Sequence, residues 1–122
     1  MSVTYIDAST LIQWIDDPSS NLCIVDVRDD DFRFGNITGC LNLPVNQFLG
    51  NLDDYKKLEK FKRPVFHCAL SQVRGPKSAT RYSNETGRDA YILKGGFSQF
   101  QEQYKGTKYI ENLNAEYWLD PY

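Results

Sequence analysis

Residues 65–79 read VFHCALSQVRGPKSA, and this stretch decides the class of fold. The apolar run that ends at His67 is typical of a buried strand, and Pro76 favours the first turn of a helix. Between them, a loop begins at Cys68 and closes at Arg74, with five residues separating the two. The stretch therefore predicts a strand, a tight loop and a helix in direct succession.

The same alternation continues along the chain. Short apolar runs predict further strands at residues 4–6, 22–27, 41–43 and 90–93. Periodic patterns and helix-ending residues predict helices at residues 8–15, 52–60, 76–84 and 97–104. Strands that alternate with helices favour a parallel sheet with helices on both faces. Ligands of such folds bind beyond the carboxyl ends of the strands, where we expect Cys68 and Arg74 to lie.

The length of 122 residues fits one domain, which we expect to span residues 1–122 with a core at about 4–105. The tail at 106–122 has no assigned structure. A net charge of −2 argues against nucleic acid as a partner, and no apolar run reaches membrane-spanning length. No Lys or Arg precedes Arg28, so the basic start of a secretory signal is missing. We expect a monomer in the cytoplasm or nucleus, with no nucleic-acid or membrane partner.

Three cysteines, Cys23, Cys40 and Cys68, are unevenly spaced and odd in number, which argues against a disulfide framework. The chain has one histidine and no Cys-x-x-Cys pair, so we expect no metal site and no resident cofactor. At least one thiol is therefore free for chemistry.

The loop after Cys68 has the features of an anion site. A loop that enters a helix points backbone N–H groups inward and adds the positive end of the helix dipole. Arg74 at its end offers a planar fork that matches a tetrahedral oxyanion. The same positive field favours a thiolate at Cys68, which makes it a nucleophile. Cys68 and Arg74 are the candidate catalytic residues, and the candidate oxyanion-binding loop is Ala69, Leu70, Ser71, Gln72, Val73 and Arg74.

Blander interpretations stand beside this one. Cys68 as a small buried hydrophobe and Arg74 as a surface charge at a helix end would need no chemistry. His67 is expected to be a supporting residue, hydrogen-bonded into the loop at the end of its strand, rather than a base.

Three stretches resemble known sequence blocks. HCALSQVRGP at residues 67–76 resembles the active-site signature of rhodanese-fold phosphatases of the cell-division-cycle dual-specificity type and of the related eukaryotic arsenate reductases. DVRDDDFRFGNITGCLNLP at residues 26–44 and LKGGFSQF at residues 93–100 resemble the two rhodanese blocks that flank it. The resemblance implies an α/β fold, a single rhodanese-like domain with a five-stranded, mainly parallel sheet and helices on both faces.

The resemblance also implies an activity. The first candidate is a protein tyrosine or dual-specificity phosphatase that acts on a phosphorylated protein or small oxyanion through a phosphocysteine. The alternative is an arsenate reductase that takes electrons from glutathione or a glutaredoxin. A sulfurtransferase or a non-catalytic rhodanese binding module comes third, because sulfurtransferase loops are usually one residue shorter and inactive copies tend to lose the cysteine or the arginine.

The chain departs from these families at several positions. Asn36 and Cys40 stand where the block has histidine and alanine, and we expect Cys40 to be packed rather than reactive. Val27 stands where the cell-cycle phosphatases have a second cysteine that protects the nucleophile as a disulfide. Asp26 and Arg28 match the Asp-x-Arg of the family, and we expect this charged pair to tie the strand end to neighbouring loops.

Residues 69–73 contain no carboxylate, where the same phosphatases carry acidic residues. The nearest cluster, Asp29-Asp30-Asp31, is expected to be the solvated start of a short helical turn. The alternative is that one of these aspartates reaches the site, because the preceding strand ends at the same edge of the sheet as Cys68. Without a general acid, a phosphatase should favour activated aryl phosphates over alkyl phosphates.

Overall fold

The computed structural model describes residues 2–112. Its strands are β1 (Val3–Ile6), β2 (Leu22–Asp26), β3 (Asn36–Ile37), β4 (Leu41–Asn42), β5 (Arg63–His67), β6 (Ala90–Leu93) and β7 (Ile110–Glu111). Its helices are α1 (Ala8–Asp16), α2 (Val45–Phe48), α3 (Leu52–Leu58), α4 (Arg74–Thr86) and α5 (Gly96–Tyr104). Two short 3-10 turns, η1 (Pro18–Ser20) and η2 (Asp30–Phe34), lie on either side of β2.

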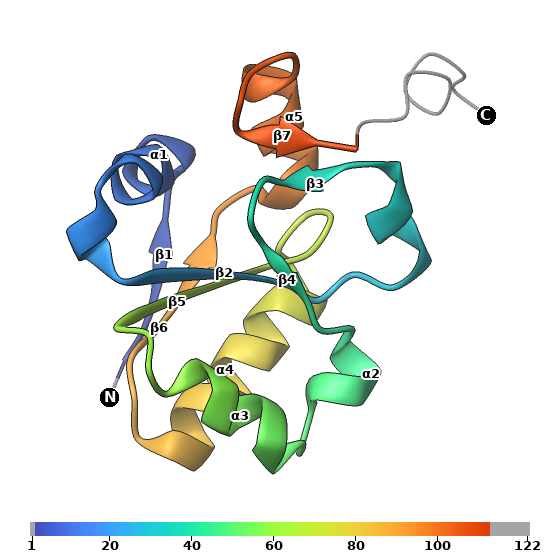
Figure 1. Ribbon diagram of the computed structural model, residues 1–122. Coiled ribbons are helices and arrows are strands. Elements are labelled where there is room, and N and C mark those ends of the chain that lie inside the picture. Colours follow the sequence, from blue (N-terminus) through green and yellow to red (C-terminus); the bar gives the residue numbers. More distant parts are fainter. Residues whose placement is uncertain (1, 113–122) are drawn as a thin grey trace.

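The main sheet has five strands in the order β1-β6-β5-β2-β4, and all neighbouring pairs are parallel (Figure 1). This confirms the predicted sheet. In the register of β2 and β5, Asp26 lies opposite His67. The next residues of the two strands, Val27 and Cys68, leave the same edge of the sheet, and the N–H of Val27 donates to the carbonyl of His67 at 3.0 Å. The Asp-x-Arg segment and the cysteine loop are therefore neighbours.

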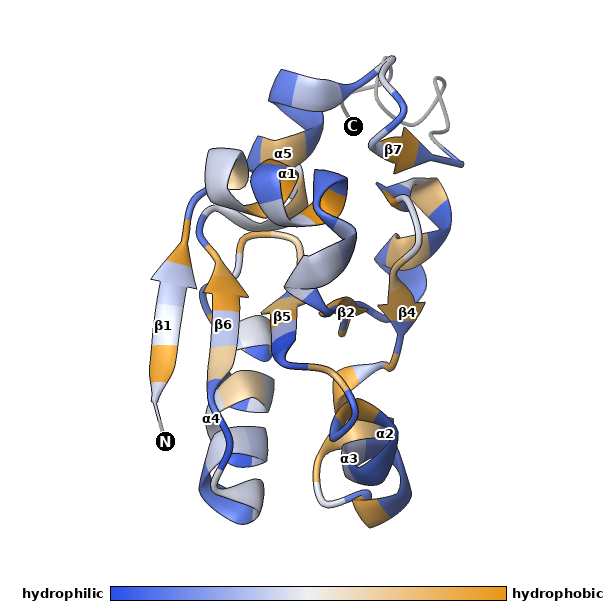
Figure 2. Ribbon diagram, turned by 60° about the vertical axis from the view of Figure 1, so that its left-hand side comes forward, coloured by the Kyte–Doolittle hydropathy of each residue, from blue (hydrophilic) through white to orange (hydrophobic). Residues whose placement is uncertain are grey.

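Helices cover both faces of the sheet, as predicted (Figure 1). Side chains alternate along each strand, so one face of β2 presents Val25 to a cluster with Tyr82 of α4, together with residues of α2 and α3. The other face presents Ile24 to a cluster with Leu11 of α1 and Phe97 of α5. Orange segments lie in the central strands β2, β5 and β6 in the hydropathy colouring, because residues of a strand covered on both faces must be apolar, whereas much of the edge strand β1 is pale (Figure 2).

Helix ends differ little from the prediction. Asp7 caps α1 by accepting a hydrogen bond from the backbone N–H of Thr10 at 2.9 Å. Helix α4 begins at Arg74, so Pro76 lies in its first turn. Proline is tolerated there because the backbone N–H groups of the first turn have no partner within the helix, and a proline loses no hydrogen bond. It ends at Gly87, whose φ of 72° forms the left-handed cap.

The sequence did not indicate α2 or the pairing of β3 with β7. These two strands are two residues each and antiparallel, with Asn36 opposite Glu111 and Ile37 opposite Ile110. Part of the unassigned tail thus packs beside the segment that follows η2. Residues 113–122 of that tail lie outside the described part of the chain.

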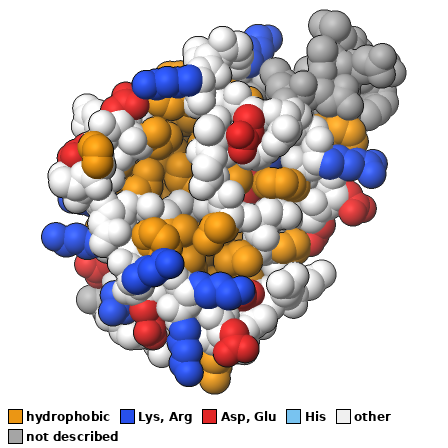
Figure 3. All heavy atoms as spheres, viewed as in Figure 1, with side chains coloured by type: hydrophobic (Ala, Val, Ile, Leu, Met, Phe, Trp, Pro, Cys, Tyr) orange, Lys and Arg blue, Asp and Glu red, His pale blue; other side chains and the backbone are white. Residues whose placement is uncertain are grey.

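The space-filling view shows the face of Figure 1 (Figure 3). Apolar side chains gather at its centre, and Lys and Arg side chains lie mainly in its lower part, with acidic side chains among them. Within residues 2–112, no helix has the length and apolar character needed to cross a membrane.

Candidate functional site

The loop between β5 and α4 forms a pocket of about 160 Å³. Cys68 follows β5 directly and is 3% exposed, and Arg74 is the first residue of α4. The sulfur of Cys68 accepts a hydrogen bond from the backbone N–H of Gly75 at 3.3 Å, so it lies at the start of the helix. The pocket is lined by Cys68, Ala69, Leu70, Gln72, Val73 and Arg74.

The start of α5 holds this loop from behind. The backbone N–H groups of Phe97 and Ser98 donate to the carbonyls of Cys68 and Ala69, at 3.0 and 2.9 Å. Gly96 has a φ of 62°, and a Cβ on it would lie 2.5 Å from the carbonyl oxygen of Cys68. Only glycine fits this close approach. The stretch at residues 93–100 therefore supports the cysteine loop.

Arg74 does not stand alone at the rim of the pocket. Its Nη1 and Nη2 donate to Oδ1 and Oδ2 of Asp31, at 3.2 and 2.9 Å, and its Nη1 lies 3.7 Å from Oδ2 of Asp29. Burial raises the pKa of Asp31, but the hydrogen bonds and charge of Arg74 outweigh it and hold that pKa below its ordinary value. Hydrogen bonding to Asp31 in turn raises the pKa of Arg74.

The expectation that these aspartates merely begin a solvated turn is therefore wrong for Asp31. The physical reason is the parallel register: β2 and β5 end at the same edge, so the turn after β2 reaches across to the start of α4. The sequence did give one signal for this contact, because the strand before the three aspartates was expected to end at the same edge of the sheet as Cys68. The run of three aspartates by itself favoured a solvated turn.

The structure places Asp26 and Arg28 beneath this turn. The guanidinium of Arg28 is buried and pairs with Asp26, with Nη2 to Oδ2 at 2.7 Å. It also donates to the carbonyls of Gly35 and Asp31, at 2.6 and 3.4 Å, and lies 4.3 Å from the centre of the Phe97 ring. The pair thus ties the end of β2 to η2 and to α5.

His67 is fully buried behind the loop. Its Nδ1 lies 3.4 Å from the carbonyl oxygen of Cys68, and its Nε2 lies 3.7 Å from Oδ2 of Asp26. Burial lowers the pKa of His67, although the charge of Asp26 opposes this effect. The ring is held under the loop and out of contact with solvent.

The remaining loop residues divide into two kinds. Leu70 and Val73 are 53% and 70% exposed, so their apolar side chains stand at the mouth of the pocket. Ser71 is 4% exposed and has a φ of 54°, and its hydroxyl has no hydrogen-bond partner within residues 2–112. A second hollow of about 410 Å³ adjoins the loop and shares Leu70 and Gln72 with the first; its lining is Tyr5, Leu70, Ser71, Gln72, Lys94, Gly95 and Gln99.

The other two thiols lie in packed surroundings. Cys23 is buried in the core beside α4, and burial raises its pKa to about 11. Cys40 is half-buried and accepts a hydrogen bond from Nδ2 of Asn36 at 3.5 Å; burial, followed by the charge of Asp26, raises its pKa to about 12. Both are poor nucleophiles at neutral pH.

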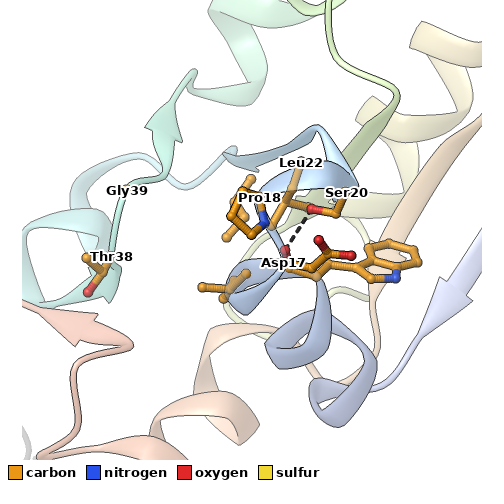
Figure 4. A pocket seen from close by; sticks show the side chains of 9 residues that line it. Asp17, Pro18, Ser20, Leu22, Thr38 and Gly39 are labelled. Atoms are coloured by element: carbon orange, nitrogen blue, oxygen red, sulfur yellow. Dashed lines mark hydrogen bonds between the residues drawn. The ribbon is translucent and has the colours of Figure 1, made fainter.

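A separate hollow of about 230 Å³ lies between η1 and the turn after β3 (Figure 4). Its lining is Trp14, Ile15, Asp17, Pro18, Ser20, Leu22, Ile24, Thr38 and Gly39. The hydroxyl of Ser20 is already bonded to the carbonyl of Trp14 at 2.7 Å, and none of the predicted site residues lies here. In the described part of the chain, no three His, Cys, Asp or Glu side chains are grouped so that they can hold a metal ion.

Comparisons with known proteins point to one family. The rhodanese-like domain matches residues 7–103. The dual specificity phosphatase ibp1 of Schizosaccharomyces pombe is 30% identical over 131 aligned residues, which cover 88% of this chain and 94% of that protein. Arsenate reductase 2.2 of Oryza sativa subsp. japonica is 37% identical, with coverage of 81% and 82%. A solved yeast protein tyrosine phosphatase of the rhodanese family superposes with a TM-score of 0.82 at 23% identity, covering 97% of this chain and 98% of that one.

Proposed function

We propose, because this chain belongs to the family of rhodanese-like domains, that it is a cysteine-dependent phosphatase of the tyrosine or dual-specificity type. Relatives in this family carry the names of phosphatases and of arsenate reductases, so an oxyanion enzyme is the common expectation. The observation that carries the proposal is the pocket itself: a buried sulfur at a helix start, with an arginine fork at the rim and apolar side chains at the mouth.

The proposed reaction has two steps. The thiolate of Cys68 attacks phosphorus, so a sulfur–phosphorus bond forms as the bond to the ester oxygen breaks and the leaving group takes the electron pair. Water then attacks the phosphocysteine, which releases inorganic phosphate and restores the thiolate. Arg74 and the loop N–H groups stabilise the charge that develops on the equatorial oxygens. The N–H of Gly75, which points at the sulfur, stabilises negative charge there.

The mouth of the pocket favours an ester over a bare oxyanion. Leu70 and Val73 are exposed apolar side chains at the rim, and the adjoining hollow continues from Leu70 toward Tyr5. An aryl or peptide group attached to phosphate has apolar surface to bury against them. Arsenate has no such group and gains nothing from this rim.

Arsenate reduction is the second candidate, and a different observation favours it. Residues 69–73 carry no carboxylate, and the pKa of Asp31 is held low by Arg74, so neither offers a proton to a poor leaving group at neutral pH. Arsenate needs no such proton for an organic leaving group. In that reaction the thiolate of Cys68 displaces hydroxide from arsenate, so a sulfur–arsenic bond forms as an arsenic–oxygen bond breaks. A glutathione thiolate then attacks the sulfur of Cys68, the electron pair of the sulfur–arsenic bond passes to arsenic, and arsenite leaves. Glutathione or a glutaredoxin reduces the resulting mixed disulfide on Cys68.

One preparation assayed in two ways tests the proposal. Hydrolysis of an aryl phosphate is measured beside the reduction of arsenate with glutathione and glutaredoxin. We expect the phosphatase reaction to dominate, to disappear in Cys68→Ser and to persist in the matched control Cys40→Ala. Efficient arsenate reduction with negligible aryl phosphate hydrolysis would replace the proposal by the second candidate.

A further inference from the structure

The ion pair between Asp31 and Arg74 uses only one edge of the guanidinium. The two hydrogen bonds to Asp31 come from Nη1 and Nη2, which form the terminal edge. The side edge, made by Nε and Nη2, still has N–H groups to offer, and Nε has no hydrogen-bond partner within residues 2–112. A guanidinium has five N–H donors in a fixed plane, so it can hold a carboxylate on one edge and an oxyanion on another.

We propose that Asp31 is a positioning residue, which holds the terminal edge of Arg74 so that the side edge faces the oxyanion pocket. The inference rests on the oxyanion-binding role proposed above for Arg74. It assigns a function to a residue outside the cysteine loop. Asp31 does not touch the reacting atoms in this arrangement; it acts through the guanidinium.

The turn that carries Asp31 is itself anchored. The carbonyl of Asp31 accepts a hydrogen bond from Nη1 of Arg28 at 3.4 Å, and Arg28 is fixed in turn by the buried carboxylate of Asp26. On the other side, Oδ1 of Asp31 accepts the backbone N–H of Asp29 at 3.1 Å, which fixes the direction of the carboxylate. A chain of contacts thus runs from the end of β2 to Arg74 at the start of α4.

This support matters because the arginine side chain is partly exposed. The side chain of Arg74 is 30% exposed and has four rotatable bonds, so ordering it on oxyanion binding would cost conformational entropy. A carboxylate that already holds the guanidinium removes part of that cost before the ligand arrives. The carboxylate also adds a negative charge near the site, which opposes anion binding. The two effects change the affinity for an anion in opposite directions. The direction in which the affinity changes when the carboxylate is removed therefore shows which effect is larger.

The test measures the affinity of the wild-type protein and two variants for inorganic tungstate, a tetrahedral anion, by calorimetry at constant ionic strength. Asp31→Asn keeps an oxygen that can accept the N–H of Asp29 but loses the charge and the second acceptor for Arg74. Asp30→Asn is the matched control, because it removes the same charge from the same exposed turn and no contact of its side chain with Arg74 is seen. Melting temperatures are measured to check that both variants fold.

We expect Asp31→Asn to weaken tungstate binding about tenfold. This is the low end of the loss seen when a residue that orients a ligand-binding side chain is replaced. Asp30→Asn should leave binding unchanged or tighten it by up to about twofold. Asp31→Glu, which restores the carboxylate, should recover most of the loss, and it also serves as the second variant if Asp31→Asn does not fold. Tighter binding by Asp31→Asn than by Asp30→Asn would overturn the inference and make Asp31 a competitor for the fork.

The kcat/KM values for a series of aryl phosphates give a second test, because loss of a positioning residue and loss of a general acid change them in different ways. A support for Arg74 lowers kcat/KM for all aryl phosphates by a similar factor, so a plot against leaving-group pKa shifts down without changing slope. Loss of a general acid would penalise poor leaving groups most and steepen the slope. A steeper slope in Asp31→Asn would therefore overturn the positioning role. If the wild type hydrolyses no aryl phosphate, the proposed function fails while the tungstate result still decides the role of Asp31.

Discussion

Replacing Arg74 by lysine keeps the positive charge and removes the geometry. In the structure the guanidinium donates to both oxygens of Asp31 through Nη1 and Nη2, and we propose that its second edge binds the oxyanion. A lysine ammonium is a single point, so it can pair with Asp31 or approach the oxyanion but cannot present two planar edges at once. We therefore expect the variant to lose the donors that stabilise the transition state, even though its charge is unchanged.

The expected loss is at least about a hundredfold in kcat/KM, because removal of one oxyanion donor typically costs 10²–10³-fold. The assay is steady-state hydrolysis of an aryl phosphate at neutral pH. Arg81→Lys makes the same chemical change on the same helix, where Arg81 pairs with Glu85 on the surface, and it should stay within about twofold of wild type. An Arg74→Lys enzyme within threefold of wild type would refute the proposed role of the fork.

Three further outcomes are expected. Wild-type log kcat/KM should fall steeply with leaving-group pKa, because Asp31 is held ionised by Arg74 and residues 69–73 contain no carboxylate; a flat plot would contradict this. Gentle peroxide treatment should give a sulfenic acid or glutathione adduct on Cys68, seen by mass spectrometry, and no bridge to Cys23. In the register Cys23 lies opposite Pro64, about 13 Å along the strand from Cys68, against a limit of about 7 Å between Cα atoms. Burial lowers the pKa of His67 below its ordinary value of 6.5, so the stability that the neutral ring contributes is complete above pH 6.5 and is lost as the pH falls below it. The melting temperature should therefore drop more below pH 6.5 in wild type than in His67→Gln. Equal drops in the two proteins would count against this role of His67.

The sheet was predictable because its signal is local. Residues 22–27 and 90–93 are short apolar runs, and a strand buried on both faces requires such a run. The position of the cysteine loop followed from the same signal, since Cys68 comes directly after a strand and Arg74 comes just before a helix. The elements that escaped prediction are α2, of four residues, and the β3–β7 pair, of two residues each. A helix of four residues is too short for its periodicity to show, and the β3–β7 pairing joins segments far apart in the sequence.

The contact between Asp31 and Arg74 shows where sequence reasoning stops. The two residues are 43 positions apart, and their pairing depends on the lateral order of β2 and β5. Composition describes Asp29-Asp30-Asp31 as a solvated charge run, and for Asp30 that description needs no change. The register brings Asp31 into hydrogen-bond contact with Arg74 and Asp29 to 3.7 Å from it, which the composition of the run does not indicate. Likewise, the need for glycine at position 96 arises from the carbonyl of Cys68, which lies on a different strand end.

The central claim is that Cys68 is the nucleophile of an oxyanion pocket, and Cys68→Ser tests it most directly. A serine hydroxyl fits the same place but stays protonated, so the pocket should remain while the attack is lost. We predict that Cys68→Ser binds tungstate within about threefold of wild type and loses at least about a thousandfold in kcat on an aryl phosphate, the scale on which nucleophile removal acts. A Cys68→Ser protein that retains most of its turnover would contradict the account.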